Sequence, residues 1–385
     1  MKYDFDKITD RRHTNSLKWD IKENELPMWV ADMDFETAPQ ISREIIKRAQ
    51  HKVFGYNIVP DEWYEAYIGW WKKRHNFEIK KQWIIFCTGV IPAISSIVRK
   101  LTTPAENVLI LTPVYNIFFN CILNNGRNAL QCPLVYNGKN YDIDFADLEE
   151  KLSNPQTTMM ILCNPQNPAG KIWDKQTLEK IGELCFKYNV IVISDEIHCD
   201  ITKPGKSYIP FASVSEKCRL NSVTCIAPTK TFNIAGLQTA AVFAANEFLK
   251  NKVNRALNTD EVAEPNTFAV GAAVAAYTYG EEWLDELLEY IDENKRTAVL
   301  FIKENLPRLN VCDSEATYLL WIDCSALKKD KENLAQYIRE KSGLYLSAGA
   351  PYGGDGENFL RLNVACPKKL LADGLERLKQ SLKGM

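Results

Sequence analysis

Near-continuous apolar runs recur through the chain, and they restrict its possible folds more than any other feature. Five of them are rich in Val, Ile, Leu and Ala and are separated by stretches with helical spacing. Strands with this composition are covered by helices on both faces, as in parallel sheets. The runs are VLILT (108–112), MMILCN (159–164), VIVISD (190–195), SVTCIA (222–227) and TAAVFAA (239–245).

The alternation of these runs with helical stretches predicts an α/β fold with a mostly parallel sheet sandwiched by helices. A further strand is expected at residues 82–88, and helices are expected at 41–49 and 178–188. The aromatic residues of DEWYEAYIGWWKKRHNF (61–77) recur at helical intervals. We therefore expect them in the core and not around a ligand.

The last third of the chain has a different texture. A long charged helical run is followed by a second α/β pattern, with YLLWID and NFLRLNVA as strands. We predict a large cofactor-binding domain at residues 46–284 and a smaller α/β domain made of residues 1–45 and 285–385. The N-terminal segment has apolar side chains without a clean period, so we expect it to pack against another part of the protein.

The charge and composition exclude several classes of partner. The formal net charge is -2 with both signs interspersed, so nothing predicts nucleic-acid binding. We find no signal peptide and no run long enough to span a membrane, so we expect a cytoplasmic protein with a small-molecule partner. The eleven cysteines lack a C-x-x-C pair, and those in apolar runs, such as Cys163 and Cys225, are expected as buried thiols in a reducing compartment.

Lys230 is the residue on which the chemical interpretation depends. It lies in APTKTFNIAGLQ (227–238), directly after the predicted strand SVTCIA. Open α/β sheets bind ligands at the carboxyl ends of their strands. Lys230 is therefore a candidate Schiff-base lysine, although a lysine in such a loop is more often an exposed surface residue.

Three polar residues follow other predicted strands. Asp195 comes directly after VIVIS, and a buried carboxylate there needs a cation, either from a ligand or from a structural ion pair. His198 is interpreted as a hydrogen-bonding group near Asp195, since HCD offers no plausible set of metal ligands. Asn167, in the turn NPQNPAG, can present its amide to a ligand oxygen or can serve the turn alone.

The remaining candidate site residues are Tyr115, Arg361, Gly89 and Val90. Tyr115 follows VLILT and could stack on a flat ring, although a core tyrosine is the commoner case. Arg361 stands inside an apolar run, where its guanidinium suits either a substrate carboxylate or a structural salt bridge. Gly89 and Val90 precede a predicted helix, so their N–H groups are candidates for binding phosphate.

The ordered set of these motifs resembles the fold type I pyridoxal-phosphate enzymes. Among them it is most similar to the MalY/PatB-type cystathionine β-lyases (C–S lyases) of the class I/II aminotransferase group. The resemblance covers nearly the whole chain, from YDFDKITDRRHTNSLKWD near the start to the strand that holds Arg361. Its motifs are Gly89-Val90, P-x-Y ending at Tyr115, NPQNPAG, SDEIHCD, TKTFNIAGLQ and FLRLNVACP.

The resemblance implies pyridoxal 5'-phosphate as the cofactor, held by Lys230 as a Schiff base. It further implies that Asp195 pairs with the pyridine nitrogen, that Asn167 bonds the phenolic oxygen and that Tyr115 stacks on the ring. Arg361 would hold the α-carboxylate of an amino-acid substrate. No metal ion is expected.

The resemblance also implies which residues bind the phosphate of the cofactor. Gly89, Val90 and Thr229 would surround it, His198 would be a further neighbour of the cofactor, and Tyr56 would reach the phosphate of the neighbouring subunit. We therefore expect a homodimer. Many aminotransferases have an arginine eight residues after the lysine, where this chain has Gln238. Both Gln238 and His198 fit the pattern of the lyase subgroup.

The implied activity is β-elimination. Cystathionine, or another cysteine S-conjugate, would give a thiol, pyruvate and ammonia, with Lys230 as the base that removes the α-proton. An aminotransferase of the same fold is the alternative, and a non-catalytic regulatory protein on this fold is a third hypothesis. The joint presence of Lys230, Asp195, Asn167 and Arg361 argues against the third. No G-x-G-x-x-G or Walker-type loop supports a nucleotide enzyme.

Overall fold

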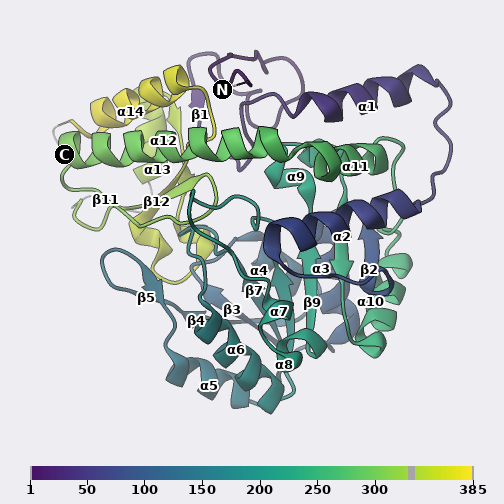
Figure 1. Ribbon diagram of the computed structural model, residues 1–385. Helices are drawn as coiled ribbons and strands as arrows, with labels where there is room; N and C mark the ends of the chain where they lie inside the picture. Colours follow the sequence, from purple (N-terminus) through teal and green to yellow (C-terminus); the bar gives the residue numbers. More distant parts are fainter. Residues whose placement is uncertain (1, 328–333, 384–385) are drawn as a thin grey trace.

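The computed structural model describes residues 2–327 and 334–383, and its centre is a seven-stranded sheet (Figure 1). Neighbouring strands are parallel except that β10 is antiparallel to both β2 and β9. The predicted α/β fold with a mostly parallel sheet is confirmed, although the apolar patterns predict neither β4 nor the reversed direction of β10. The order is β2 (Ile84–Cys87), β10 (Ala240–Phe243), β9 (Ser222–Ile226), β8 (Ile191–Asp195), β7 (Thr157–Cys163), β3 (Asn107–Thr112) and β4 (Asn128–Pro133).

Strand β2 shows why the strands are apolar on both faces. Successive residues of a strand point to opposite faces of the sheet. Ile84 and Phe86 pack into the core that holds the aromatic residues of α2 (Asp61–His75), whereas Ile85 and Cys87 pack with α3 (Val90–Leu101) and α10 (Glu247–Thr259). Because helices cover both faces, neither set of side chains meets water.

The other helices complete the two layers. On the side of α3 and α10 the core includes α4 (Ile117–Leu123). On the opposite side it includes α5 (Phe145–Ser153), α6 (Lys175–Lys187), α7 (Phe211–Val214) and α8 (Glu216–Leu220). Two of these helices begin after an aspartate, Asp144 or Asp174, whose carboxylate accepts N–H groups of the first turn.

The aromatic stripe of α2 lies in the core, as its helical spacing predicts. Trp63, Tyr67, Trp70 and Trp71 are all buried. They pack beside α11 (Ala269–Tyr279), where the rings of Tyr67 and Tyr277 lie 4.7 Å apart in an edge-to-face arrangement. Helix α1 (Pro39–Gln50) lies against α11 on the outside of this layer.

The C-terminal part of the chain forms a second, four-stranded antiparallel sheet. Its order is β11 (Asn310–Val311), β12 (Leu319–Asp323), β15 (Phe359–Asn363) and β14 (Ser347–Ala348). Helices α13 (Leu334–Ser342) and α14 (Lys368–Leu382) contribute to the core beside it. Figure 1 shows α12 (Glu281–Asn305) extending from α11 to these elements.

The N-terminal segment packs against this C-terminal part, as expected for an apolar segment without a period. Strand β1 (Leu26–Pro27) pairs in parallel with β13 (Leu344–Tyr345). The predicted division into residues 46–284 and residues 1–45 with 285–385 stays a prediction, and α12 runs through its boundary. The shorter elements are β5 (Val135–Tyr136), β6 (Tyr141–Asp142), α9 (Pro228–Thr231), and the 3₁₀ turns Lys81–Trp83, Ala235–Leu237, Ala350–Tyr352 and Gly356–Asn358.

Two other sequence expectations concern thiols and membranes. All eleven cysteines are buried and unpaired, as the apolar context of several of them predicts. Among the residues that the structure describes, no helix combines the length and the apolar character needed to cross a lipid bilayer.

Candidate active site

Strands β7, β8 and β9 end at one edge of the large sheet, and the predicted polar residues follow these ends. A cavity of about 310 Å³ opens there. The fold thus brings together predicted site residues that are up to 141 positions apart in the chain, from Gly89 to Lys230. Eight of the ten predicted site residues line the cavity: Gly89, Val90, Tyr115, Asn167, Asp195, His198, Thr229 and Lys230.

Asp195 is a buried carboxylate at the end of β8. Burial raises its pKa to about 7, while the N–H of Ile197, which donates to Oδ1 over 3.1 Å, and the charge of Lys230 oppose that rise. Within the described residues, no lysine, arginine or histidine nitrogen lies within 4.0 Å of this carboxylate. The side chain therefore faces the cavity without the cation that a buried carboxylate needs.

Lys230 is the lysine in the lining of the same cavity. Its turn, α9, begins at Pro228, and its ammonium donates a hydrogen bond to the backbone oxygen of Ala31 in the N-terminal segment. Burial lowers the pKa of Lys230 to about 8. Since Lys230 and Asp195 line one cavity without an ion pair within 4.0 Å, there is space between them.

His198 lines this cavity as a neutral ring. Burial, with the charges of Lys230 and Arg361, lowers its pKa to about 3. Its Nδ1 has no hydrogen-bond partner among the described residues. Tyr115 is likewise uncharged, because burial raises the pKa of its phenol to about 12.

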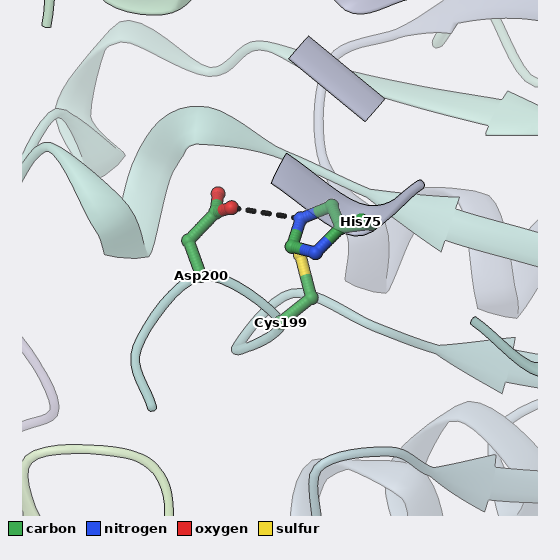
Figure 2. Close-up of side chains that lie close together, drawn as sticks. All are labelled: His75, Cys199 and Asp200. Atoms are coloured by element: carbon green, nitrogen blue, oxygen red, sulfur yellow. Dashed lines mark hydrogen bonds and ion pairs between the residues drawn. The ribbon is translucent and has the colours of Figure 1, made fainter. Parts of the chain in front are cut away.

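Figure 2 shows three residues that could together hold a metal ion, His75, Cys199 and Asp200. Sequence spacing suggests no metal ligands around His198, and it does not reveal that His75 of α2 meets Cys199 and Asp200. Both oxygens of Asp200 are in use: Oδ1 accepts from Trp70 Nε1 and pairs with His75 Nε2, each over 2.9 Å, and Oδ2 accepts from Thr231 over 3.0 Å. This carboxylate therefore anchors the residue next to Lys230 to α2.

The predicted phosphate cradle lies at the start of α3. Gly89 precedes the helix and Val90 is its first residue, and no side chain of the described residues caps the N–H groups of the first turn. Such groups bind anions. Thr88, Thr229 and Gln238 line the same cavity.

A second cavity of about 530 Å³ adjoins the first and shares Ala31, Tyr115 and Lys230 with it. Arg361 of β15 lies in its lining and is only 5% exposed. Its Nη1 donates to Asn167 Oδ1 over 3.3 Å and its Nη2 to Trp29 O over 3.0 Å, while Nε has no partner among the described residues.

Arg361 forms no salt bridge among the residues that the structure describes: no carboxylate oxygen lies within 4.0 Å of its guanidinium. The alternative interpretation of a structural salt bridge is therefore wrong for this part of the chain. A buried guanidinium that lacks an acid and faces a cavity suits a carboxylate ligand.

The second cavity has an aromatic and charged wall that no sequence pattern predicts. The rings of Trp29 and Tyr345 stack 4.7 Å apart, and the guanidinium of Arg339 lies 3.6 Å from the centre of the Tyr345 ring. Arg339 also binds both oxygens of Glu25 at 2.8 Å. These residues belong to segments with no strand-end motif, so only the pairing of β1 with β13 brings them to the site.

Tyr56 lies apart from the other predicted site residues. It is fully exposed and does not line either cavity. Val53, Phe54 and Ile58, its neighbours in the same segment, are exposed as well. The structure of one chain therefore leaves the predicted contact of Tyr56 with a second subunit as a prediction.

The chain is similar to known proteins over almost its whole length. The family model for aminotransferase class I and II matches residues 24–378. The cystathionine β-lyase PatB of Bacillus subtilis (strain 168) is 42% identical over 385 residues, which cover 98% of this chain and 99% of that protein.

Two solved structures have the same fold throughout. Cystalysin from Treponema denticola, which contains a pyridoxal 5'-phosphate cofactor, aligns with a TM-score of 0.96 and 33% identity over 100% of this chain and 99% of that one. The pyridoxal-phosphate-bound C–S lyase from Staphylococcus hominis aligns with a TM-score of 0.93 and 32% identity over 99% and 98% of the two chains.

Proposed function

The chain belongs to the aminotransferase class I and II family, and we propose that it is a pyridoxal-phosphate-dependent carbon–sulfur β-lyase. Its substrate is cystathionine or another cysteine S-conjugate, and its products are a thiol, pyruvate and ammonia. Water supplies the oxygen of pyruvate. The observation that carries the proposal is a buried carboxylate, Asp195, that has no cationic partner within 4.0 Å among the described residues and shares a cavity with a buried amine, Lys230.

The residues of this cavity fit pyridoxal 5'-phosphate. Asp195 would meet the protonated pyridine nitrogen, which supplies the missing cation, and the amine of Lys230 would hold the cofactor covalently through Nζ. Asn167 would bond the phenolic oxygen and Tyr115 would lie against the ring. When bound, the cofactor supplies an electron sink for negative charge at the α-carbon of the substrate.

The phosphate would lie at the N-terminus of α3, beside Gly89, Val90 and Thr229. Partial positive charge at a helix N-terminus stabilises such a group. Gln238 lines the cavity at the position where many aminotransferases have a charged arginine. Much of the phosphate binding would therefore depend on the N–H groups of α3. The neutral ring of His198 completes the wall near Asp195.

Lys230 is the proposed base. Its pKa of about 8, lowered by burial, leaves a neutral fraction of the amine near neutral pH. Its Nζ takes the α-proton of the bound substrate, and the proton held there is then available to the departing thiolate. Thr231 and Asp200 hold the turn that carries this amine.

Arg361 would bind the α-carboxylate of the substrate. Its side chain is already held at Asn167 and Trp29, so little freedom is lost on binding. The sulfur substituent would extend along the stacked rings of Trp29 and Tyr345.

A homodimer is part of the proposal. Tyr56, together with the exposed apolar residues Val53, Phe54 and Ile58, supports a contact with a second copy of the chain. In that contact Tyr56 would reach the phosphate site of the partner. A cytoplasmic location is also proposed, and the eleven buried, unpaired thiols support it.

The test is an assay of the purified holoenzyme with cystathionine. A β-lyase releases pyruvate and free thiol without any added keto acid. An aminotransferase forms product only when a keto acid acceptor is present, and a non-catalytic protein forms none. If pyruvate appears only with an acceptor, the lyase proposal is wrong.

A further inference from the structure

A separate cavity of about 370 Å³ lies between α12 and residues 311–314. Four basic residues line it, Lys203, Lys295, Arg296 and Lys303, against two acidic residues, Asp292 and Asp313. Lys203 comes from the segment after β8, and the other three come from α12. We propose that this cavity binds a small divalent oxyanion, a sulfate or phosphate group, through the ammonium of Lys295. The proposal is independent of the proposed lyase function.

Lys295 is the buried lysine in the lining of this cavity. Its side chain is only 6% exposed, and its Nζ donates to Ser314 Oγ over 2.9 Å and to Ala316 O over 3.0 Å. An ammonium has three N–H donors, so a third remains for a ligand. No carboxylate of the described residues lies within 4.0 Å of Nζ, and a buried cation without such a partner favours an anion in the adjacent space.

The charges around Lys295 come from each element packed against it. On its own helix, Asp292 pairs with Arg296 over 3.3 Å, and Lys303 lies further along. Lys203 faces it from the segment after β8, and Asp313 from residues 311–314. Burial, assisted by Lys203, lowers the pKa of Lys295 to about 7, whereas Asp292 opposes this shift.

A bound divalent anion would favour the charged form of Lys295. Binding near neutral pH therefore takes up a proton at Nζ. The linkage gives the site a property that a patch of exposed lysines lacks, because those are already protonated at neutral pH. At pH 7 the uptake should be about half a proton per site, and it should decrease toward pH 5.5.

The residues at the rim of the cavity indicate which anions it can accept. Lys203, Arg296 and Lys303 are exposed there, as are the apolar side chains of Val299 and Leu300. The rim can therefore accept either a free ion or a phosphate monoester whose organic part contacts Val299 and Leu300. Both have the same charged group, which Lys295 would bind.

Residues 314–316 connect this cavity to the active site. Ser314 and Ala316 accept the hydrogen bonds of Lys295, and the N–H groups of Glu315 and Ala316 donate to Gly170 O over 2.9 and 2.8 Å. Gly170 closes the turn that carries Asn167. A Cβ at Gly170 would lie 2.3 Å from Ser314 Oγ, and its φ is +73°, so the two segments pack too closely for any other residue.

The experiment is calorimetric titration of the holoenzyme with sulfate, in two buffers with different heats of ionisation. The bound cofactor keeps sulfate out of the phosphate cradle, and sulfate does not itself titrate near neutral pH. We expect saturable binding with proton uptake. Parallel titrations with inorganic phosphate and with glycerol 3-phosphate compare the free ion with a monoester. Tighter binding of the ester would show that its organic part contacts the rim.

Three variants test the assignment. Lys295→Met should weaken sulfate binding at least tenfold and abolish the proton uptake, with the cofactor absorbance unchanged. Lys303→Met, on the rim, should weaken binding about two- to threefold and keep the uptake. Lys100→Met, an exposed lysine of α3, is the matched control and should bind sulfate like the parent protein.

Several outcomes would overturn the proposal. One is a parent holoenzyme that does not bind sulfate. Another is a Lys295→Met protein with unchanged affinity and proton uptake, which would mean that sulfate binds elsewhere, for example at Arg361. If Lys295 had only a structural role, Lys295→Met would have a lower melting temperature, but its sulfate affinity and its proton uptake would not change. Lys295→Arg gives a further check, because arginine is always charged: sulfate binding with undiminished proton uptake would exclude Lys295 as the titrating group.

Discussion

The cofactor half and the substrate half of the active site are built in different ways. The cofactor half consists of residues at the ends of neighbouring strands of one sheet, such as Asn167, Asp195 and Lys230. The substrate half is lined mostly by the N-terminal segment, by residues 335–352 and by β15, with residues 115–117 and Lys230 where it meets the cofactor half. The first depends on one sheet, whereas the second depends on how the C-terminal part packs against it.

The two halves also differ in their charges. In the cofactor half, an acid and an amine share one cavity, and burial moves both pKa values toward neutrality. In the substrate half, Arg361 is a buried guanidinium with no acid within 4.0 Å among the residues that the structure describes. A site of the first kind can move protons, whereas one of the second kind can hold a carboxylate. Variants should therefore separate chemistry from substrate binding.

Lys230→Ala should have the largest effect. Without the amine, the protein should lose the yellow chromophore that borohydride reduces, and the β-lyase rate should decrease by about 10⁴-fold or more. Absorbance of the purified variant and the pyruvate assay measure both. Lys100→Ala is the matched control, and a Lys230→Ala protein that keeps the chromophore would contradict the assignment.

Asp195→Asn should come next. It keeps the shape of the side chain but removes the charge, so the rate should decrease by about 10²- to 10³-fold and the cofactor should bind more weakly. Steady-state kinetics at saturating cofactor and a cofactor titration would measure these effects. Unchanged rate and cofactor affinity would show that the carboxylate does not face the ring.

The same variant makes a prediction about pH. Burial raises the pKa of Asp195 to about 7, so the folded, cofactor-free protein binds this proton more tightly than the unfolded chain does. The stability contributed by that proton is lost as pH rises from about 4 to 7. Cofactor-free Asp195→Asn should therefore melt about 2–5 °C above the parent at pH 8, and the difference should vanish below about pH 4.

Arg361→Ala should affect mainly the substrate half. Loss of a charge-assisted pair with the α-carboxylate should raise KM by about 30- to 100-fold. The chromophore should remain, which separates this variant from Lys230→Ala. The exposed Arg255→Ala serves as control. Cofactor loss instead of a KM effect would assign Arg361 a structural role and would break the distinction between the two halves.

The smallest effect is expected at the wall that the stacked rings of Trp29 and Tyr345 form. Tyr345→Leu should raise KM about three- to tenfold for conjugates with a large thiol group and leave small ones unchanged, because the sulfur substituent is the part of the substrate that the ring would contact. A double-mutant cycle with Trp29→Leu should show a coupling of about 0.5–1.5 kcal/mol. Equal effects on large and small substrates would place the substituent elsewhere.

Several elements are predictable from local pattern. The buried strands β7, β8 and β9 and the polar residues that follow them could be located, because strands covered on both faces have near-continuous apolar sequences. The strand-end rule then places Asn167, Asp195 and Lys230 at one edge of the sheet. The aromatic stripe of α2 could be assigned to the core for the same kind of reason, since its period matches a helix.

Other elements have no local signal. The direction of β10 depends on its pairing with β2 and β9. The stack of Trp29 on Tyr345 joins residues 316 positions apart, and neither has a sequence context that marks it as a wall of the site. The meeting of His75 with Asp200 likewise depends on where α2 packs.

The sequence by itself determined the α/β class, the family and the identity of the residues at the strand ends. Only the tertiary structure decided that Arg361 has no acid partner among the described residues, that Lys230 and Asp195 share a cavity, and that Lys295 is a buried amine. The physical reason is that periodicity is a property of neighbouring residues. Burial, charge environment and pKa depend instead on segments that lie far apart in the chain and meet only on folding.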